Sequence, residues 1–250
     1  MSEKSKIYFA SDFHLGVPDH ASSRKREDKV VAWLSMCQKD AKEIYLVGDL
    51  FDFWFEHKHT APKGHVRFLG KLAELTDAGT PVHVFTGNHD MWMFEYLPKE
   101  IGVQMHRAPI QKTFGDKKFY IGHGDGLGPG DNAYKLLKKI FANKFCQWCF
   151  ARLHPNLSFW LAQNSSKKSR IQSSGEDEKY LGDNEEWLAI YAKEILQKEH
   201  FDYFIFGHRH LPIDISVGPK STYFNLGEWM NHYTYVVFDG AKAELKTWEG

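Results

Sequence analysis

Five apolar stretches of this sequence each end in a turn that carries side chains of the kind that bind metal ions. The clearest is the run 44–47, which leads directly into Gly48 and Asp49. A short apolar run that ends at turn residues predicts a buried strand, and open α/β sheets bind ligands at the carboxyl ends of their strands. We therefore expect the fold to bring these turns together at one edge of a sheet. The turns lie at residues 10–14, 48–52, 86–90, 122–125 and 207–210.

The spacing of apolar residues predicts that strands and helices alternate in the first part of the chain. Strands are expected at 7–10, 44–47 and 81–85, separated by helices over 22–39 and 62–78. This order implies parallel strands joined by right-handed crossovers. The rest is expected to form a hairpin and a helix, followed by an antiparallel closure typical of α+β or mixed sandwich folds. The hairpin is predicted at 111–114 with 118–121, and the helix at 180–198. The later strands are predicted at 203–206, 213–217, 222–225, 233–238 and 243–248.

Length and composition predict one domain over residues 1–250, with room for an insertion. The charges cancel, with 32 basic and 32 acidic residues, so net charge argues neither for nor against a nucleic-acid partner. Three cysteines provide no disulfide framework and fit a reducing compartment. We see no signal-peptide pattern before the first predicted strand and no apolar run of the ~20 residues that a spanning helix needs. A cytoplasmic location is therefore expected.

Residues 127–175 differ in composition from the rest of the chain. Between Asn132 and Ser174 there is no Asp or Glu, whereas eight residues are Lys or Arg. We interpret this segment as a helical cap over the metal-binding edge, although a solvated basic helix is the alternative. Its lysines and apolar side chains suit a substrate that is anionic and partly apolar, or the face of an anionic membrane. One helical stripe is expected to contain Ala133, Leu136, Leu137, Ile140, Phe141, Phe145 and Trp148, before a break at Pro155.

The side chains at the five turns form a mixed set of nitrogen and oxygen donors. An Asp that follows Gly is common in ordinary turns, so each turn alone is weak evidence. Together they provide two carboxylates, four imidazoles and one amide oxygen, which suit Mn, Fe, Zn or Co better than Ca. Two divalent ions would share one bridging carboxylate. Because two carboxylates offset only part of the charge of the two ions, the centre would stay electrophilic towards phosphate. The candidate ligands are Asp12, His14, Asp49, Asn88, His123, His208 and His210.

The pattern DxH, GDxxD, GNHD, GH and GHxH, which runs from Asp12 to His210, resembles the calcineurin-like metallophosphoesterases. The resemblance implies a two-sheet αββα sandwich with a dimetal site at the sheet edge and two divalent ions, Mn²⁺ being the first expectation. It also implies that Asp49, Asn88 and His89 act in catalysis, with Asp49 bridging the two ions. One ion would be held by Asp12, His14, Asp49 and His210, and the other by Asp49, Asn88, His123 and His208.

A narrower resemblance is to the members of this family that hydrolyse UDP-2,3-diacylglucosamine in lipid A biosynthesis. It is carried by residues 48–54, 123–134, 162–167 and 226–229. It implies attack of a metal-bound hydroxide on the α-phosphate, which yields UMP and 2,3-diacylglucosamine 1-phosphate. It further implies a protein peripheral to the inner membrane, with a nucleotide-lipid substrate and no nucleic-acid partner. The implied substrate contacts are Asn88, Asp131, Tyr134, Asn164, Lys167 and His208.

One residue departs from the narrower pattern, because His89 stands where these diphosphatases often have Arg. In phosphoesterases generally this His stabilises or protonates the leaving oxygen, whereas a sugar phosphate is a leaving group of low pKa that needs little general acid. The sequence therefore keeps open a phosphodiesterase or nuclease of the same superfamily, in which the cap lysines would follow a nucleic-acid backbone. A metal-binding scaffold that docks a protein partner is the third hypothesis, and the complete ligand set disfavours it.

Overall fold

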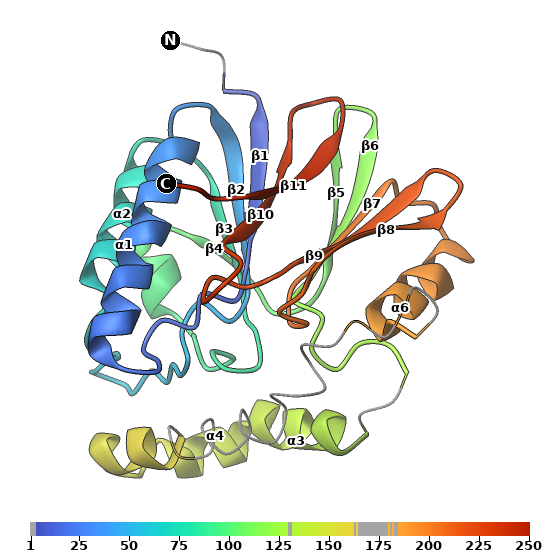
Figure 1. Ribbon diagram of the computed structural model, residues 1–250. Coiled ribbons are helices and arrows are strands. Elements are labelled where there is room, and N and C mark those ends of the chain that lie inside the picture. The colour runs from blue at the N-terminus through green and yellow to red at the C-terminus, as the bar shows by residue number, and fades with distance from the viewer. Residues whose placement is uncertain (1–3, 130–131, 163, 165–179, 181, 183–184) are drawn as a thin grey trace.

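Two β-sheets packed face to face form the centre of the structure, and helices cover their outer faces (Figure 1). The computed structural model describes all residues except 1–3, 130–131, 163, 165–179, 181 and 183–184. One sheet has the strand order β11-β10-β1-β2-β3-β4, and the other has the order β5-β6-β7-β9-β8. The predicted αββα arrangement of layers is therefore confirmed.

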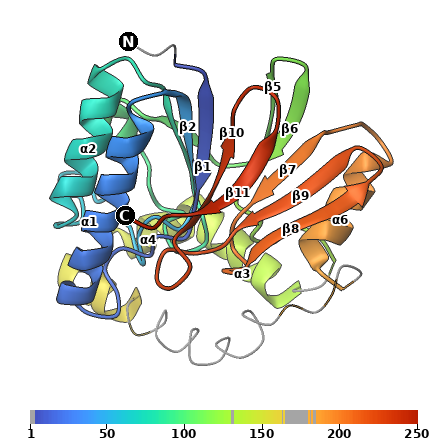
Figure 2. The ribbon, with the colours of Figure 1, turned by 45° about the horizontal axis from the view of Figure 1, so that its top comes forward.

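The first sheet is built from the alternating strands and helices that the sequence predicts. Strands β1 to β4 are parallel neighbours, while β10 pairs antiparallel with β1 and with β11. Helices α1 (His20–Cys37) and α2 (Val66–Asp77) cover its outer face, and the short π-helix η1 (Leu97–Ile101) precedes β4 (Figure 2). The strands are β1 (Lys6–Ala10), β2 (Ala41–Val47), β3 (Val82–Phe85), β4 (Gln104–His106), β10 (Thr234–Phe238) and β11 (Ala243–Thr247).

The second sheet contains the predicted hairpin, formed by β5 (Ile110–Phe114) and β6 (Lys117–Ile121). Strands β7 (Tyr203–Phe206) and β9 (Ser221–Leu226) continue it in parallel, and β8 (Pro212–Gly218) pairs antiparallel with β9. Helix α6 (Trp187–Leu196) packs on its outer face. The prediction of a helix over 180–198 was too long, because Gly182 has a φ of +103°, which a right-handed helix cannot contain.

Alternate residues of the strands line different hydrophobic layers, as expected for strands that are buried on both faces. In β1, Tyr8 and Ala10 face α1 and α2, whereas Ile7 and Phe9 face the second sheet. Phe9 stacks on Tyr45 from its own sheet and on Phe119 from the facing sheet, with ring centroids 5.1 and 5.8 Å apart. Apolar packing between the sheets therefore fixes the relative position of their carboxyl-terminal edges.

Helices α3 (Asn132–Ala142) and α4 (Lys144–Phe150) lie below this edge in Figure 1, together with the helical residues 155–162. The expected single stripe before Pro155 was wrong, because the helix is interrupted at Asn143. The Asn143 side chain accepts hydrogen bonds from the backbone N–H groups of Phe145 and Cys146 and so begins a new helix. Among the described helices, none is both long and apolar enough to cross a bilayer.

Replacing Phe9 by Ala is expected to lower the free energy of unfolding by about 3–5 kcal/mol, because it leaves a cavity between the two sheets. Urea unfolding of the metal-free protein measures this loss. Thr247→Ala on the exposed strand β11 is the matched control and should change stability by less than about 0.5 kcal/mol. A loss below about 1 kcal/mol for Phe9→Ala would contradict the packing described here.

Candidate metal centre

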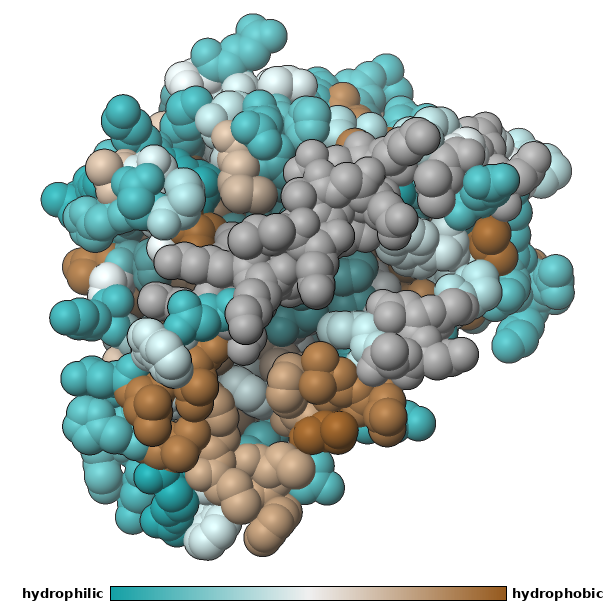
Figure 3. Space-filling model, turned by 60° about the horizontal axis from the view of Figure 1, so that its bottom comes forward, coloured by the Kyte–Doolittle hydropathy of each residue, from teal (hydrophilic) through white to brown (hydrophobic). Residues whose placement is uncertain are grey.

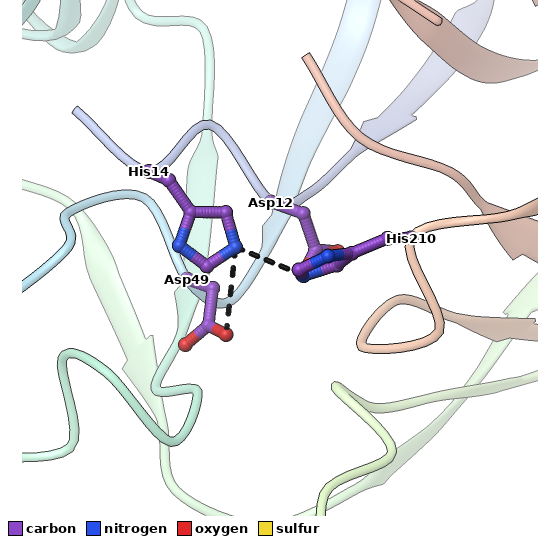
Figure 4. Close-up of side chains that lie close together, drawn as sticks. All are labelled: Asp12, His14, Asp49 and His210. Carbon is purple, nitrogen blue, oxygen red and sulfur yellow. Dashed lines mark hydrogen bonds and ion pairs between the residues drawn. The ribbon is translucent and has the colours of Figure 1, made fainter. Parts of the chain in front are cut away.

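The turns after β1, β2, β3, β6 and β7 meet where the two sheets end, and they bring the predicted side chains together. One group consists of Asp12, His14, Asp49 and His210, each offering one donor atom within 4.8 Å of the others (Figure 4). A second group joins Asp49 with His123 and His208 under the same criterion. Asp49 belongs to both groups.

In the first group, two imidazoles and two carboxylates converge on one point. The Nε2 atoms of His14 and His210 are 3.0 Å apart. Asp12 Oδ1 lies 3.7 Å from the Nε2 atom of His14 and 3.4 Å from that of His210. Asp49 Oδ2 completes the group at 3.9 Å from His14 Nε2. Such a mixed N/O set can hold a first-row transition metal.

In the second group, the orientation of His123 is set by the backbone. Its Nδ1 atom donates to the carbonyl oxygen of Val47 at 2.8 Å, so Nε2 is the nitrogen that faces the site. Nε2 lies 3.3 Å from Asp49 Oδ2 and 3.2 Å from Asn88 Oδ1. Asn88 thus joins the same cluster, and the structure assembles the whole predicted donor set.

Each carboxylate has one oxygen held by the protein and one oxygen directed at the site. Asp49 Oδ1 accepts from the backbone N–H of His89 at 2.8 Å, and Asp12 Oδ2 accepts from Ser11 Oγ and from the backbone N–H of His208. The other oxygens, Asp12 Oδ1 and Asp49 Oδ2, are buried without a hydrogen-bond partner. Leaving a buried carboxylate oxygen unpaired is costly, and a bound cation would satisfy both atoms. The donor set therefore fits two metal ions that share Asp49.

The electrostatics of the site favour positive charge. Burial opposes ionisation of Asp49, yet the neighbouring imidazoles, His123 above all, keep its pKa well below the usual value. Burial likewise opposes charge on His123, but the carboxylates, Asp49 first, outweigh it and raise the pKa of His123 to about 10. Burial and the charge of His123 lower the pKa of His208 to about 4. A bound metal ion would therefore replace a proton on His123, whereas His208 would bind it as the neutral imidazole.

The backbone at the candidate ligands is strained, which the sequence did not reveal. A positive φ is uncommon for residues other than Gly and persists where the surrounding structure enforces it. Here hydrogen bonds from the N–H groups of Asp12 and His14 to the carbonyls of Gly48 and Asp49, each 3.0 Å, tie the first two turns together. The residues concerned are Asp12 (56°), His14 (43°), Asp49 (52°), His208 (72°) and His210 (54°).

Two motif glycines are required because candidate metal ligands from other turns pack against them. A Cβ atom at Gly207 would lie 2.5 Å from Asp12 Oδ2, and one at Gly87 would overlap the Asp49 carboxylate. Neither contact leaves room for a side chain. The glycines that sequence analysis treated as turn residues therefore also make space for the carboxylates.

His89 lies beside the first group rather than inside it. Its ring is perpendicular to that of His14, with centroids 4.8 Å apart, and its Nδ1 atom donates to the backbone carbonyl of Asp52 at 3.0 Å. Two acidic residues to which the sequence analysis gave no role support this arrangement. Asp52 lies close to both rings, and buried Asp90 accepts from the N–H groups of Gly87 and Leu50, which joins the second turn to the third. In the sequence, only their positions in the motifs GDxxD and GNHD indicated that these two residues belong to the site.

The predicted substrate contacts are only partly described. Tyr134 lies on α3, with its ring centroid 6.4 Å from that of His208, and its hydroxyl donates to Asp125 Oδ2 at 2.8 Å. Asn164 is helical and half-buried. Asp131 and Lys167 lie outside the described residues. Sequence analysis missed Asp125, which also binds Lys138 of α3 and so connects this helix to the turn that carries His123.

The comparison with known families matches residues 5–212 to the calcineurin-like phosphoesterases. The chain therefore belongs to this family and is a metal-dependent hydrolase, and the family's dimetal site corresponds to the geometry above. It is similar to the UDP-2,3-diacylglucosamine hydrolase of Porphyromonas gingivalis, with 38% identity over 98% of both chains. The enzymes of the same name from Histophilus somni and Vibrio atlanticus are each 25% identical, over 90% and 98% of this chain and 92% and 98% of theirs.

Alanine substitutions of His210 and His208 are expected to weaken different metal sites, because the two imidazoles face different groups. Each variant should lose at least about tenfold in affinity for one Mn²⁺ ion, since even groups outside the ligand set contribute this much. Calorimetric titration of the metal-free variants measures both affinities. His59→Ala, which removes an exposed histidine, is the control. An identical loss of both ions in both variants would count against two separate sites.

Proposed function

We propose that the chain hydrolyses UDP-2,3-diacylglucosamine to UMP and 2,3-diacylglucosamine 1-phosphate. The observation that carries the proposal is the buried Asp49 Oδ2, which faces both donor groups and has no hydrogen-bond partner. Such an atom suits a bridge between two divalent ions, the arrangement that serves phosphoester hydrolysis. The substrate is suggested by the relative of that name, which is 38% identical over nearly the whole chain.

The roles of the ligands follow from the two donor groups. Asp12, His14, Asp49 and His210 would hold one ion, and Asp49, Asn88, His123 and His208 would hold the other. When bound, two divalent ions polarise a phosphoryl group and lower the pKa of a water molecule. The mixed donor set is compatible with Mn²⁺, the ion we propose. The strained turns keep the ligands in place, so little reorganisation accompanies the reaction.

His89 is proposed to act on the phosphate rather than on a metal ion. Its Nδ1 atom donates to the Asp52 carbonyl at 3.0 Å and its ring lies against that of His14, so the imidazole stands at the edge of the metal centre. In hydrolysis, a water oxygen bonds to the α-phosphorus and the bond to the oxygen of the sugar phosphate breaks. Because the departing phosphate is a weak base, it needs charge stabilisation more than a proton. We propose that His89 and Asn88 bind the phosphoryl oxygens.

Residues 127–175 are proposed to form a cap whose described helices place a polar end beside the metal centre. On α3, Tyr134 and Lys138 both contact Asp125, two residues beyond His123. The far end of α3 is held by Trp92, whose Nε1 donates to the carbonyl of Phe141 at 2.9 Å, with the two rings 5.2 Å apart. Helix α3 therefore leads from the metal centre towards α4.

The helices of this cap expose many apolar side chains, three on α3 and five beyond it (Figure 3). An open hollow of 360 Å³ on α4 is lined by Phe145, Cys146, Cys149, Phe150 and Leu153. A phosphate-binding end followed by an apolar end matches the order of groups in a nucleotide-linked diacyl sugar. We call these side chains the apolar patch: Leu136 (61% exposed), Leu137, Ile140, Phe145 (70%), Trp148 (53%), Leu157, Trp160 (60%) and Leu161.

The same patch supports attachment to a membrane. Exposed Lys139 and Lys144, with Arg152 stacked on Trp148 at 4.6 Å, place positive charge beside the apolar side chains. Apolar insertion combined with attraction to anionic lipid is the usual basis of peripheral binding. We therefore propose that the protein works on the cytoplasmic face of the inner membrane, where its lipid substrate would lie. A charged nucleic-acid backbone would not be expected to bind so large an apolar area.

Purified protein loaded with Mn²⁺ is expected to convert UDP-2,3-diacylglucosamine to UMP and the sugar phosphate. Asp49→Asn removes the shared carboxylate and should lower the rate more than about 100-fold, as does loss of one transition-state contact in other enzymes. Mass spectrometry of the products and metal analysis of both proteins test this. Preferential cleavage of single-stranded DNA would favour the nuclease alternative, and an Asp49→Asn variant with two metals and a normal rate would refute the site.

Trp148→Asn is expected to raise KM for the diacyl substrate about tenfold, if the lost contacts equal about two methylenes at about 0.8 kcal/mol each. A small chromogenic phosphodiester should be hydrolysed as by the unmodified protein. Val66→Asn, which removes an apolar side chain on α2 that is more exposed than Trp148 (71% against 53%), is the control for surface polarity. Equal losses on lipid and small substrates would mean that α4 has only a structural role. Phe141, which sequence analysis placed on the same stripe, instead packs on Trp92 and is unsuitable for this test.

A further inference from the structure

The turn after β7 carries two proposed ligands, His208 and His210, with Arg209 between them. The N–H group of Arg209 donates to the carbonyl of Gly207 at 2.9 Å, which closes a three-residue turn around His208. With its φ of 72°, His208 has the geometry of the rare and strained γ-turn, and His210 follows with a φ of 54°. Such a backbone persists only where neighbouring groups enforce it.

The first half of this turn is held by backbone and side-chain hydrogen bonds. The N–H of Gly207 donates to the carbonyl of His123 at 2.9 Å, and Asn225 Nδ2 donates to the carbonyl of Gly207 at 2.5 Å. The N–H of His208 donates to Asp12 Oδ2 at 3.1 Å. These contacts fix Gly207 and His208, the first of the two candidate ligands in this turn.

The side chain of Arg209 is buried in the layer between the second sheet and α6. Arg209 and Glu186 are both fully buried, and Arg209 Nε donates to the two oxygens of Glu186 at 3.0 and 3.1 Å. The guanidinium also lies 4.0 Å above the ring of Trp187. Glu186 is the N-cap residue of α6, yet its side chain makes no capping hydrogen bond and is directed to Arg209.

A buried ion pair of this kind is not expected to raise the free energy of unfolding by much. Removing two charges from water is expensive, and apolar residues of similar size often stabilise a protein as well or better. Its position between the two histidines indicates another role. We propose that the pair formed by Arg209 and Glu186 positions His208 and His210, so that the affinity of both metal sites depends on it. The inference rests on the dimetal site of the proposed function.

The test compares metal affinity with stability in variants of the pair. Glu186→Gln keeps the size of the side chain and removes its charge, and Arg209→Lys keeps the charge but loses the planar fork and the stacking on Trp187. We expect both variants to bind each of two Mn²⁺ ions about 10- to 100-fold more weakly in calorimetric titrations of the metal-free protein. Leu75→Ala on α2, a buried substitution in the opposite layer, should lower the melting temperature without changing metal affinity.

A second design covers the case in which a single variant fails to fold. Arg209→Met combined with Glu186→Leu removes both charges of the pair together and is expected to fold, and it should show the same loss of Mn²⁺ affinity. Normal affinity in a destabilised Glu186→Gln protein, or in the double variant, would overturn the proposal. Failure of the unmodified protein to bind two ions would overturn it together with the dimetal site. If the unmodified protein binds two Mn²⁺ ions but does not hydrolyse UDP-2,3-diacylglucosamine, only the proposed substrate is contradicted.

Discussion

The structure depends on one carboxylate, that of Asp49, whose two oxygens have different partners. Oδ1 is fixed by the N–H of His89, while Oδ2 faces His14 on one side and His123 on the other without a hydrogen bond. Turns from both sheets must meet for this to occur, since His14 follows a strand of the first sheet and His123 one of the second. The aromatic packing of Phe9 and Phe119 between the sheets therefore supports the site as well as the fold.

Contacts within the protein itself hold the backbone of the site in place. Positive φ angles at the candidate ligands are costly, and they are balanced by hydrogen bonds between turns and by buried side chains such as Asp90 and Arg209. Rigid donors of this kind are what a dimetal hydrolase needs, because its catalysis depends on groups that are already oriented. The helices α3 and α4 are built differently, because they expose apolar side chains and contact the loops that follow the strands through residues such as Asp125, Trp92 and Phe55.

Much of this fold could be predicted because its signals are local. Short apolar runs ended by Gly, Asp, Asn and His identified β1, β2, β3 and β7 together with the candidate ligands that follow them. Other features depend on contacts between side chains that the spacing of apolar residues does not reveal. The interruption at Asn143 arises from one side chain that caps a new helix, and α6 begins late because Gly182 has a left-handed backbone. The pairing of Arg209 with Glu186 joins residues 23 positions apart, both of types expected at the surface.

The central claim is that two metal ions share Asp49. Anomalous diffraction from crystals of the protein grown with Mn²⁺ tests it most directly, because each ion produces its own peak. We expect two peaks about 3.5–4 Å apart, on either side of Asp49 Oδ2, one beside His14 and His210 and the other beside His123 and His208. A single peak, or peaks that do not contact Asp49, would contradict the account.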